Sequence, residues 1–492
     1  MRRTGPRQLN LVFADSPSGG GKTEPPDASG RRSLLLHKAR NKKTTGPVAS
    51  AADTSRLLED VASEANLATA LLNVVRNKGA PGVDGQTVEE AEAKAPSIIG
   101  RLRQDLLMER YRPGDVRRVW LNKPGGGRRG LGIPNVVDRM VQQAVLQILE
   151  PLFEPTFHDS SHGFRPNRGA HTAVAEAKGY LKDGYQTVVD LDLAKFFDHV
   201  HHQRLLARIA QRVKDERIIR LIRLMLTASV VMPDGTKVAV REGTPQGGPL
   251  SPCLSNIVLD ELDWELARRG LRFVRYADDS NIFVRSERAG LRIMASLCRY
   301  LEKRMRLQVN AAKSGVRTPE EVAFLGFSFC CTNKDQGDCH VAVVPSRKAE
   351  QRLKATIRAM TPPNWGRSIA SCLAGISRYL NGWMAYFRLS TSEAVDGLRV
   401  IDAHVRRRVR AIIVRHRKRP RFLFRHLVSR GVSRKAAANC TYCGKRAWVQ
   451  SNRPAMTRAY PPSWFQGRMV SLKDRWHELN PPQVSSQLSL EI

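Results

Sequence analysis

Residues 272–286, RFVRYADDSNIFVRS, place two neighbouring aspartates between two apolar, β-prone stretches. This pattern restricts the local fold strongly, because it predicts a β-hairpin with Asp278 and Asp279 at its tip. Acidic residues are common in turns, so the pair could serve only to form the turn. Alternatively, the two carboxylates are half of a metal site, which would require further acidic residues to meet them in the fold.

A second acidic cluster lies in the segment TVVDLDLAKFFDHV. Its alternation predicts a strand with Val189, Leu191 and Leu193 on one face and Asp190 and Asp192 on the other. Two carboxylates on an apolar strand are costly to bury unless a cation meets them. Taken alone, the segment is equally compatible with a solvated outer face and with a site for a divalent metal ion.

The segment REGTPQGGPLSPCLSNIVLDELDWEL lies between these two clusters in the sequence. Gly243, Gly247 and Gly248 allow the backbone to approach a ligand closely. Ser251 and Pro252 are expected to be the N-cap and the first residue of a helix. The buried stripe of that helix is predicted to comprise Leu254, Ile257, Val258 and Leu262. A glycine-rich loop between two acidic clusters favours a ligand site over simple packing.

The composition indicates a polyanionic partner. Among 492 residues, 81 are Lys or Arg and 46 are Asp or Glu, which gives a formal net charge of +35. Nucleic acid is the usual partner of so basic a chain. A membrane partner is not expected, because no apolar run approaches the length of a membrane span. The basic N-terminus lacks a sustained apolar stretch, so no secretion signal is expected.

The cysteines favour a reducing compartment, and therefore the cytoplasm, over a disulfide framework. Only Cys440 and Cys443 among the eight have CxxC spacing. A structural zinc site needs four ligands, and after Cys443 only His477 could add one. The pair is therefore expected to bind no metal.

Residues 1–55 are rich in Gly, Pro, Ser, Lys and Arg and are predicted to form a disordered basic arm. The arm contains GGGKT, which ends like a phosphate-binding loop, but Ser16 stands where GxxxxGK[ST] requires its first glycine. Ordered structure is expected to begin near Leu57. The periodic apolar residues of 137–149 predict an amphipathic helix that only packs.

Taken in order, these motifs resemble a known family. An Asp strand with an aromatic residue five positions on, then TPQGGPLSP, then YADD, resembles the palm of a reverse transcriptase. The stretch from RRVWLNKPGG to RGAHTA is similar to the fingers of the group II intron subfamily, and NKGAPGVDG to its N-terminal extension. VNAAKS and FLGFSF resemble later palm motifs. The resemblance covers residues from about 70 to 480.

The C-terminal part also resembles this subfamily. YLNGWMAYFRLS, followed by IDAHVRRRVRAIIVRHRKRPR, looks like its thumb, the maturase domain. AWVQSNRPAMTRAYPPSWFQGRMVSLKDRW is similar to the end of bacterial members that lack the HNH endonuclease. The resemblance therefore implies an α+β right-hand polymerase. Its expected parts are fingers and palm with an antiparallel sheet and helices (56–345), an α-helical thumb (346–435) and a small basic DNA-binding segment (436–492).

The activity that the resemblance implies is RNA-directed DNA polymerisation combined with maturase function. Its implied partners are group II intron RNA, an RNA template with a DNA primer, target DNA and dNTPs. The protein would assist splicing of the intron and copy it into DNA. Two Mg²⁺ ions would serve the nucleotidyl transfer. The expected location is the cytoplasm of a bacterium, with the nucleoid or a ribonucleoprotein.

The same resemblance assigns the metal site. Asp192 and Asp278 are the expected principal ligands, and Leu193 supplies backbone close to the metal. Asp279 is expected to reach the ions only because the turn rotates one member of the pair. Asp190 shares a face with Asp192 and either supports it or is solvated.

Substrate-binding residues also follow from the resemblance. Phe197 matches an aromatic residue that would clash with a ribose 2′-hydroxyl and so favour dNTPs, whereas Phe196 is the expected core residue. Gln246 matches a glutamine near the nascent base pair. The remaining matches are the basic residues Lys123 and Arg129 at the triphosphate, and Lys313 near the leaving pyrophosphate. This chain reads RRGLGIP where the family usually has Arg-Pro-Leu-Gly, so Arg128 is an alternative to Arg129.

The thumb segment is basic in a way that does not depend on any family. Its apolar stripe is predicted to comprise Val395, Leu398, Ile401, Val405, Val409 and Ile412. Ten Lys or Arg and no acid occur from His404 to Arg425, which favours a nucleic-acid backbone as partner. The arginines expected to bind nucleic acid are Arg406, Arg407, Arg410, Arg415 and Arg417, together with Arg165 and Arg168 of the fingers. The aromatic residues Tyr379, Trp383, Tyr386 and Phe387 are expected to form the thumb core.

Two alternatives belong to other functional classes. A splicing cofactor with an inactive polymerase would be expected to lose its carboxylates, but Asp192, Asp278 and Asp279 are all present. A reverse transcriptase recruited for repair or defence would share the palm and differ in its partners.

Overall fold

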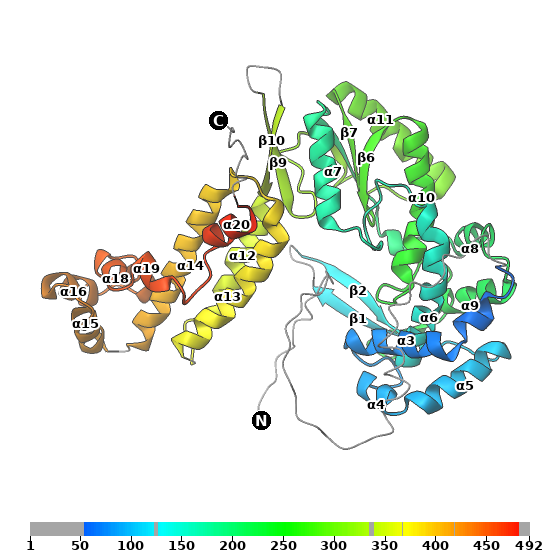
Figure 1. Ribbon diagram of the computed structural model, residues 1–492, viewed down its shortest axis with the longest axis horizontal. Helices are drawn as coiled ribbons and strands as arrows, with labels where there is room; N and C mark the ends of the chain where they lie inside the picture. Colours follow the sequence, from blue (N-terminus) through cyan, green and yellow to red (C-terminus); the bar gives the residue numbers. More distant parts are fainter. Residues whose placement is uncertain (1–53, 123–125, 334–338, 367, 418, 482–492) are drawn as a thin grey trace, which may run out of the picture. The chain divides into compact units, whose positions relative to one another are not determined.

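The computed structural model describes residues 54–122, 126–333, 339–366, 368–417 and 419–481 (Figure 1). The predicted basic arm, except for its last two residues, lies outside this range, and so does Lys123. The described residues mix helices with β-sheets, which confirms the predicted α+β class. Within them, no helix is long and apolar enough to span a lipid bilayer.

The first described segments form a group of helices and a small mixed sheet. The first four helices are α2 (Leu57–Val61), α3 (Glu64–Arg76), α4 (Val88–Ala93) and α5 (Ala95–Leu107). They share a hydrophobic core with α6 (Val136–Phe153), which is the helix predicted from residues 137–149. The sheet has the order β2-β1-β4-β5 and consists of β1 (Val116–Asn122), β2 (Arg128–Ile133), β4 (Val230–Val231) and β5 (Lys237–Val238).

A second sheet, which we call the palm sheet, has the order β6-β7-β3-β8. Its strands are β3 (Thr187–Asp192), β6 (Arg272–Tyr276), β7 (Asp279–Val284) and β8 (Gly315–Arg317), and each neighbouring pair is antiparallel. β6 and β7 form the predicted hairpin.

Side chains of the palm sheet alternate between two cores, as a pleated strand requires. Val189 and Leu191 belong to the core that includes α10 (Ser251–Arg268) and α11 (Glu287–Tyr300). Val188 belongs to the core that includes α7 (Ala170–Lys182). Figure 1 shows these three helices around the strands. The predicted alternation along β3 is thus confirmed.

The remaining elements of this half are short or peripheral. They are η1 (Glu154–Thr156), η2 (Phe196–Asp198), α8 (His202–Ala210), α9 (Glu216–Leu226) and the π-helical turn η3 (Leu301–Met305). A hairpin of β9 (Phe327–Asn333) and β10 (Cys339–Pro345) follows the palm sheet and packs on α7.

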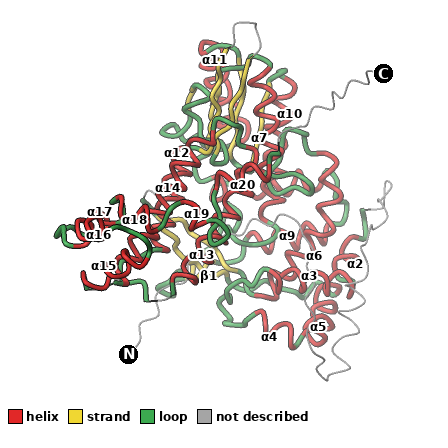
Figure 2. Tube along the Cα trace, turned by 60° about the vertical axis from the view of Figure 1, so that its left-hand side comes forward, coloured by secondary structure: helices red, strands yellow, loops and turns green. Residues whose placement is uncertain are grey.

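The C-terminal part is helical, as Figure 2 shows. It begins with α12 (Arg347–Met360), α13 (Ile369–Tyr386), η4 (Phe387–Leu389) and α14 (Ala394–His416). Six shorter helices follow: α15 (Pro420–Ser429), α16 (Arg434–Thr441), α17 (Ala447–Gln450), α18 (Pro454–Ala459), α19 (Pro462–Phe465) and α20 (Leu472–Leu479). The aromatic residues predicted for the thumb core do pack there, and the Trp383 and Phe387 ring centroids lie 4.3 Å apart.

One helix start differs from the expectation. The predicted stripe of α10 is buried, but Ser251 is the first helical residue and Leu250 occupies the N-cap position. The hydroxyl of Ser251 donates a hydrogen bond to the Pro245 carbonyl at 2.7 Å, so it ties the glycine-rich loop to the helix instead of capping the helix. The capping prediction for Ser251 was therefore wrong.

The buried carboxylate of Asp402 in α14 holds the last described helix in place. It accepts hydrogen bonds from the backbone N–H groups of Leu472 and Lys473, at 2.9 and 3.1 Å, and from the Ser471 hydroxyl at 2.8 Å. These donors form the N-terminus of α20, where a negative charge is favourable. Asp402 is only 2% exposed, so water cannot replace these bonds.

We predict that Asp402→Ala loosens α20 without unfolding the chain. Loss of hydrogen bonds to a buried carboxylate should cost about 3 kcal/mol. Amides of α20 should then exchange with deuterium roughly a hundredfold faster. The matched control is Asp396→Ala on the same helix, whose side chain is 89% exposed and should leave exchange unchanged. Equal exchange rates in the two variants would contradict the anchoring role of Asp402.

Candidate active site

The two acidic clusters meet in the palm sheet. Asp192, the last residue of β3, pairs directly with Asp279, the first residue of β7, and Asp190 pairs with Asn281. Paired residues in antiparallel strands lie on the same face of a sheet. Asp278 lies in the two-residue loop between Tyr276 and Asp279. The carboxylates of all four aspartates line one cavity of about 590 Å³.

The loop that carries Asp278 has an unusual backbone. Ala277 adopts a φ of +57°, in the left-handed region that side-chain-bearing residues rarely occupy. A left-handed residue in a two-residue loop reverses the chain within that loop. As a result Asp278 and Asp279 line the same cavity although they are adjacent in sequence.

The buried side chain of Arg275 stabilises this loop. Its guanidinium group is fully buried and forms an ion pair with Asp263 of α10, with donor–acceptor distances of 2.7 and 2.6 Å. The same group donates to Asn256 at 3.0 Å, to the Ser161 hydroxyl at 2.7 Å and to the carbonyl oxygen of Ala277 at 2.9 Å. One side chain therefore joins α10, the segment around Ser161 and the loop before Asp278.

The segment at Ser160–Gly163 fixes the other side of the hairpin. The backbone N–H of Arg275 donates to the Ser160 carbonyl at 2.8 Å, and the N–H of His162 donates to the Arg275 carbonyl at 2.9 Å. A Cβ atom on Gly163 would lie 2.3 Å from the Ala277 nitrogen, so only glycine allows this close approach.

Two positively charged side chains form ion pairs with the carboxylates. The Lys313 ammonium lies 2.6 Å from Oδ2 of Asp192, which also accepts a hydrogen bond from the Asn310 side chain at 3.2 Å. Arg317 of β8 forms an ion pair with Asp190. Asp190 is therefore not simply a solvated carboxylate: it is paired with Arg317 and lines the same cavity as the other aspartates.

The backbone near Asp192 is also engaged. Leu193 bridges to Val309, and the carbonyl of Asp192 accepts hydrogen bonds from the N–H of Asn310 at 2.9 Å and from the Ser314 hydroxyl at 3.2 Å. These contacts hold the end of β3 against the segment that carries Lys313.

The carboxylates repel one another. Desolvation and the negative charges of Asp190, Asp278 and Asp192 raise the pKa of Asp279 to about 7, although part of this residue is open to solvent. Desolvation, followed by the charge of Asp192, also raises the pKa of Asp278, and Arg129 and Lys313 partly oppose this shift. For Asp190, desolvation raises the pKa and Arg317 opposes it.

Crowded carboxylates of this kind fit a divalent cation, because hard cations prefer carboxylate oxygens and would relieve the repulsion. The side chains are not arranged as a finished cage. Among the described residues, no three Asp, Glu, His or Cys side chains are close enough together to hold a metal ion as they stand. In Asp192, one carboxylate oxygen is instead directed to Lys313 and Asn310.

The predicted nucleotide-binding residues form a second group. Nε of Arg129 in β2 donates to the Gln246 side-chain oxygen at 2.9 Å, so these two residues are in contact. Phe197 and Gln246 line one cavity of about 330 Å³, together with the Gly243 loop. Phe196 is 2% exposed, which confirms it as the core residue of the pair, whereas Phe197 is only partly buried.

The glycine-rich loop is tied to Phe197. The Thr244 N–H donates to the Phe197 carbonyl at 2.7 Å. Gly243 has a φ of +91°, and a Cβ atom there would lie 2.8 Å from the same carbonyl oxygen. The backbone conformation and the close contact with Phe197 therefore require glycine at position 243.

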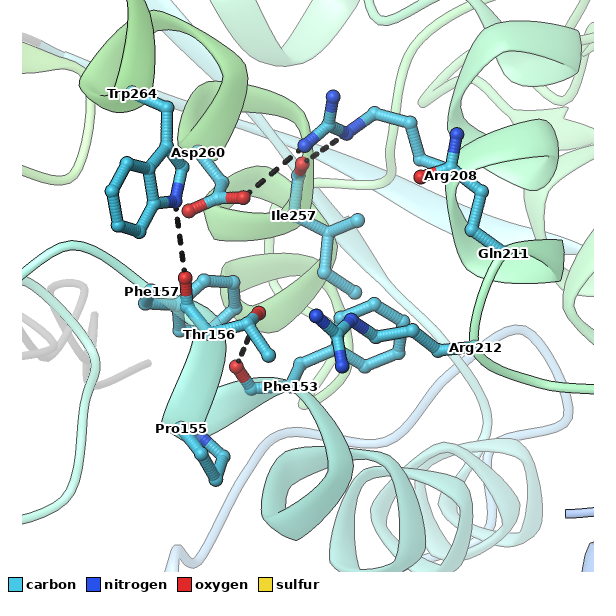
Figure 3. Close-up of a pocket in the computed structure, with 10 residues that line it drawn as sticks. All are labelled: Phe153, Pro155, Thr156, Phe157, Arg208, Gln211, Arg212, Ile257, Asp260 and Trp264. Carbon is cyan, nitrogen blue, oxygen red and sulfur yellow. Dashed lines mark hydrogen bonds and ion pairs between the residues drawn. The ribbon is translucent and has the colours of Figure 1, made fainter. Parts of the chain in front are cut away.

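Figure 3 shows another cavity, of about 310 Å³, which shares no lining residue with the carboxylate cavity. Its one acidic side chain, Asp260, is paired with Arg208 at 3.2 Å, and Trp264 donates to the Thr156 carbonyl at 3.1 Å. Burial, followed by the charge of Asp263, raises the pKa of Asp260 to about 6. This cavity therefore has one paired carboxylate, whereas the carboxylate cavity has four aspartates.

The arginines predicted to bind nucleic acid differ in their surroundings. Arg165 is 8% exposed and bonds to Glu154 and to the Ser161 carbonyl, and Arg168 pairs with Asp159. In α14, buried Arg410 donates to the Tyr460 carbonyl at 2.8 Å.

Arg407 lies 3.9 Å above the Trp448 ring, so it too holds the C-terminal helices. By contrast, no ion pair is found within the described residues for Arg406, Arg415 or Arg417.

Sequence reasoning missed three residues of the site. Arg275 directly precedes YADD, but its role depends on Asp263, twelve positions earlier and on a different element. Asn310 and Arg317 flank Lys313, and the VNAAKS motif contained the first of them. An arginine four positions after Lys313 carried no sequence signal that would assign it to Asp190.

Two families match the chain. Residues 121–329 match the family described as Reverse transcriptase (RNA-dependent DNA polymerase), and residues 350–431 match the one described as Group II intron, maturase-specific domain. The first match contains all four aspartates, and the second contains α14.

Several known proteins are similar to parts of this chain. Protein YkfC of Escherichia coli (strain K12) is 33% identical over 347 residues, which cover 62% of this chain and 91% of YkfC. The group II intron-encoded protein LtrA of Lactococcus lactis subsp. cremoris is 37% identical over 204 residues, which cover 41% of this chain and 34% of LtrA. A chain of one solved structure, the partial Cas6-RT-Cas1–Cas2 complex, is 23% identical. The match covers 50% of this chain and 42% of that chain, with a TM-score of 0.33.

We predict that Arg275→Met strongly destabilises the protein. Removing one partner of a buried ion pair leaves the Asp263 charge uncompensated, which typically costs about 3–5 kcal/mol. The urea midpoint of the full chain, followed by tryptophan fluorescence, should fall accordingly. Arg272→Met removes an exposed arginine from the same strand and should have little effect. The double variant Arg275→Met/Asp263→Leu should recover most of the loss. An Arg275→Met protein as stable as Arg272→Met would show that the buried pair does not stabilise the fold.

Proposed function

The chain belongs to the reverse transcriptases of the group II intron family, and on this premise we propose how its residues perform the reaction. It is an RNA-directed DNA polymerase with a maturase domain. We propose domain limits of 56–345 for fingers and palm, 346–435 for the thumb and 436–492 for a DNA-binding segment. The observation that carries the proposal is the convergence of Asp192, Asp278 and Asp279 on one cavity.

Asp192, Asp278 and Asp279 would hold two Mg²⁺ ions, with the backbone at Leu193 close by. When bound, the ions would lower the pKa of the primer 3′-hydroxyl and offset the negative charge on the phosphoryl oxygens. The crowded carboxylates and the raised pKa of Asp279 support this role. Lys313, now paired with Asp192, would turn to the pyrophosphate side once cations compensate the carboxylates.

The incoming dNTP would bind between the palm sheet and β2. Arg129 would pair with the triphosphate, since a guanidinium group suits phosphate oxygens. Its contact with Gln246 supports this position next to the nascent base pair. Phe197 would exclude a ribose 2′-hydroxyl, and the partly exposed ring supports this assignment. Lys123 would add a second positive charge at the triphosphate.

The intron RNA and the primer-template would bind to the basic thumb. Arg406, Arg415 and Arg417 are the best candidates, because none of them is paired with a carboxylate in the described residues. Target DNA would use the segment after residue 435. The net charge of +35 supports polyanionic partners. We propose that the protein acts in the bacterial cytoplasm, in a ribonucleoprotein with its intron or at the nucleoid.

The first test is dNTP incorporation on a primed RNA template with Mg²⁺. Asp278→Asn should lower the rate by at least about a hundredfold. It removes a carboxylate that would help to hold the ions, and the ions would stabilise the charge that develops in the transition state. Asp396→Asn, an exposed change in α14, is the control and should leave the rate unchanged. An unaltered protein that binds RNA tightly but incorporates nothing would instead favour a maturase without polymerase activity.

Sugar selection tests the role of Phe197. In Phe197→Ala, the ratio of the kcat/KM for a dNTP to that for the matching rNTP should fall by about ten- to a hundredfold, because the clash with the 2′-hydroxyl is removed. Phe197→Tyr keeps a ring and should retain the selection. If the alanine variant discriminates as well as the unaltered protein does, another residue is the steric gate.

The maturase role has its own test. Splicing of the host intron at low Mg²⁺ should be faster with the protein than without it, and Asp278→Asn should support splicing as well as the unaltered protein does. Splicing that is no faster with protein would favour a reverse transcriptase recruited for another task.

A further inference from the structure

A cavity of about 680 Å³ lies where the thumb meets the C-terminal helices. The residues that define it come from four places: Trp365 before α13, Arg415 and Arg417 at the end of α14, Arg430 after α15, and Tyr460 and Trp464 around α19. The cavity shares no residue with the carboxylate cavity. The maturase-specific match ends at residue 431, so the C-terminal segment completes the cavity.

The cavity is positively charged and uncompensated. None of its lining residues, all of which belong to the described chain, carries a carboxylate. Within the described residues Arg415, Arg417 and Arg430 form no ion pair. Nη1 of Arg415 is buried and has no hydrogen-bond partner there. A buried guanidinium nitrogen without an acceptor is costly, and an anionic ligand beside the Arg415 guanidinium group would offset its charge.

Aromatic side chains line the cavity together with these arginines. The Arg430 guanidinium lies 4.3 Å from the centre of the Tyr460 ring and 5.7 Å from that of Trp464. Tyr460 and Trp464 meet edge to face, with centroids 4.8 Å apart. Trp365 also lines the cavity, and its indole N–H donates to the Ser368 carbonyl at 3.3 Å. The Arg430 guanidinium group and the Tyr460 and Trp464 rings are thus in mutual contact.

Hydrogen bonds fix the walls as well. Nε of Arg430 donates to the Ala459 carbonyl at 2.7 Å, and Arg417 lies 3.3 Å from Nδ1 of His426. The other ring nitrogen of His426 contacts the Tyr460 hydroxyl. Desolvation and the positive charges of Arg417 and Arg430 lower the pKa of His426, so it accepts from Arg417 as a neutral ring.

We propose that this cavity binds an unpaired nucleotide of a single-stranded nucleic acid. Phosphates contact Arg415, Arg417 and Arg430, and a base stacks on Trp365 or Trp464. Basic grooves lined with aromatic rings bind single strands in this way, because every base has a face that can stack. The inference rests on the proposed nucleic-acid function. It adds a site that is built jointly by the thumb and the C-terminal segment.

Crosslinking to the full-length protein tests the site. The probes are 12-nucleotide strands with one 5-iodouracil, made once as RNA and once as DNA, and a duplex of the same sequence. After near-ultraviolet irradiation, peptides are mapped by mass spectrometry. We expect crosslinks at Trp365, Tyr460 or Trp464 with at least one single strand. The strand that gives the higher crosslinking yield identifies the natural ligand as RNA or as DNA. Crosslinks only outside the cavity, or only with the duplex, would overturn the proposal.

A charge comparison provides the second measurement. Arg415→Gln/Arg417→Gln should reduce the slope of log Kd for the single strand against log salt by about 1.4, since each phosphate contact contributes about 0.7. The control Arg421→Gln/Arg425→Gln removes two exposed arginines of α15 outside the cavity, and its slope should change by less than about half as much. Equal changes in the two variants would overturn the proposal.

Primer extension by the unaltered protein distinguishes failure of the cavity site from failure of the polymerase assignment. Extension without a crosslink in the cavity means that the cavity does not bind the strand, whereas the polymerase assignment is correct. Crosslinks in the cavity without extension mean that the strand site is right and the polymerase assignment is wrong. Asp278→Asn should crosslink as the unaltered protein does, because it changes no cavity residue.

Discussion

The buried ion pair between Arg275 and Asp263 is the contact on which the site depends, because both side chains are completely shielded from water. Burying two charges is favourable only when their geometry is good and their remaining hydrogen-bonding groups are satisfied. Here Asn256, Ser161 and the Ala277 carbonyl provide the remaining contacts of the guanidinium group. The requirement to satisfy Arg275 therefore draws α10, the Ser160–Gly163 segment and the hairpin into one arrangement. Asp278 follows Ala277 directly, so its position is a consequence of that packing.

The second constraint is the concentration of negative charge in a strongly basic chain. Four carboxylates share one cavity while the chain as a whole carries a net charge of +35. Lys313 and Arg317 partly neutralise Asp192 and Asp190, but desolvation and the neighbouring carboxylates still raise the pKa of Asp279. This division of charge suits the proposed reaction: the basic surface attracts nucleic acid, and the acidic cavity selects small cations within it. In the proposed reaction, Lys313 would leave Asp192 once a metal ion binds there, whereas Arg317 would stay paired with Asp190.

Much of this arrangement could be predicted from sequence, and the limits have physical causes. Local periodicity predicted β3, α6 and the β6–β7 hairpin, because each pattern is contained in one short segment. Ser251 was misassigned as a cap because its hydroxyl had an alternative acceptor, Pro245, in a loop whose course the sequence does not reveal. The roles of Arg275 and Arg317 were not predicted, because their partners Asp263 and Asp190 lie on other elements. Likewise, the packing roles of Arg407 and Arg410 depend on helices that follow 40 to 50 residues later. Residue type predicted a basic face there, but only the tertiary structure separates arginines that pack from arginines that are free to bind.

The most direct test of the central claim is a crystal structure of the protein with Mn²⁺, a substitute for Mg²⁺ whose anomalous scattering locates it independently of the refined atoms. We predict anomalous peaks in the carboxylate cavity, within coordination distance of Asp192 and Asp278, with Lys313 displaced from Asp192 and the Arg275–Asp263 pair unchanged. Occupied Mn²⁺ sites elsewhere and none in the cavity would contradict the claim, because the convergence of these carboxylates would then serve the fold of the palm sheet and not the chemistry.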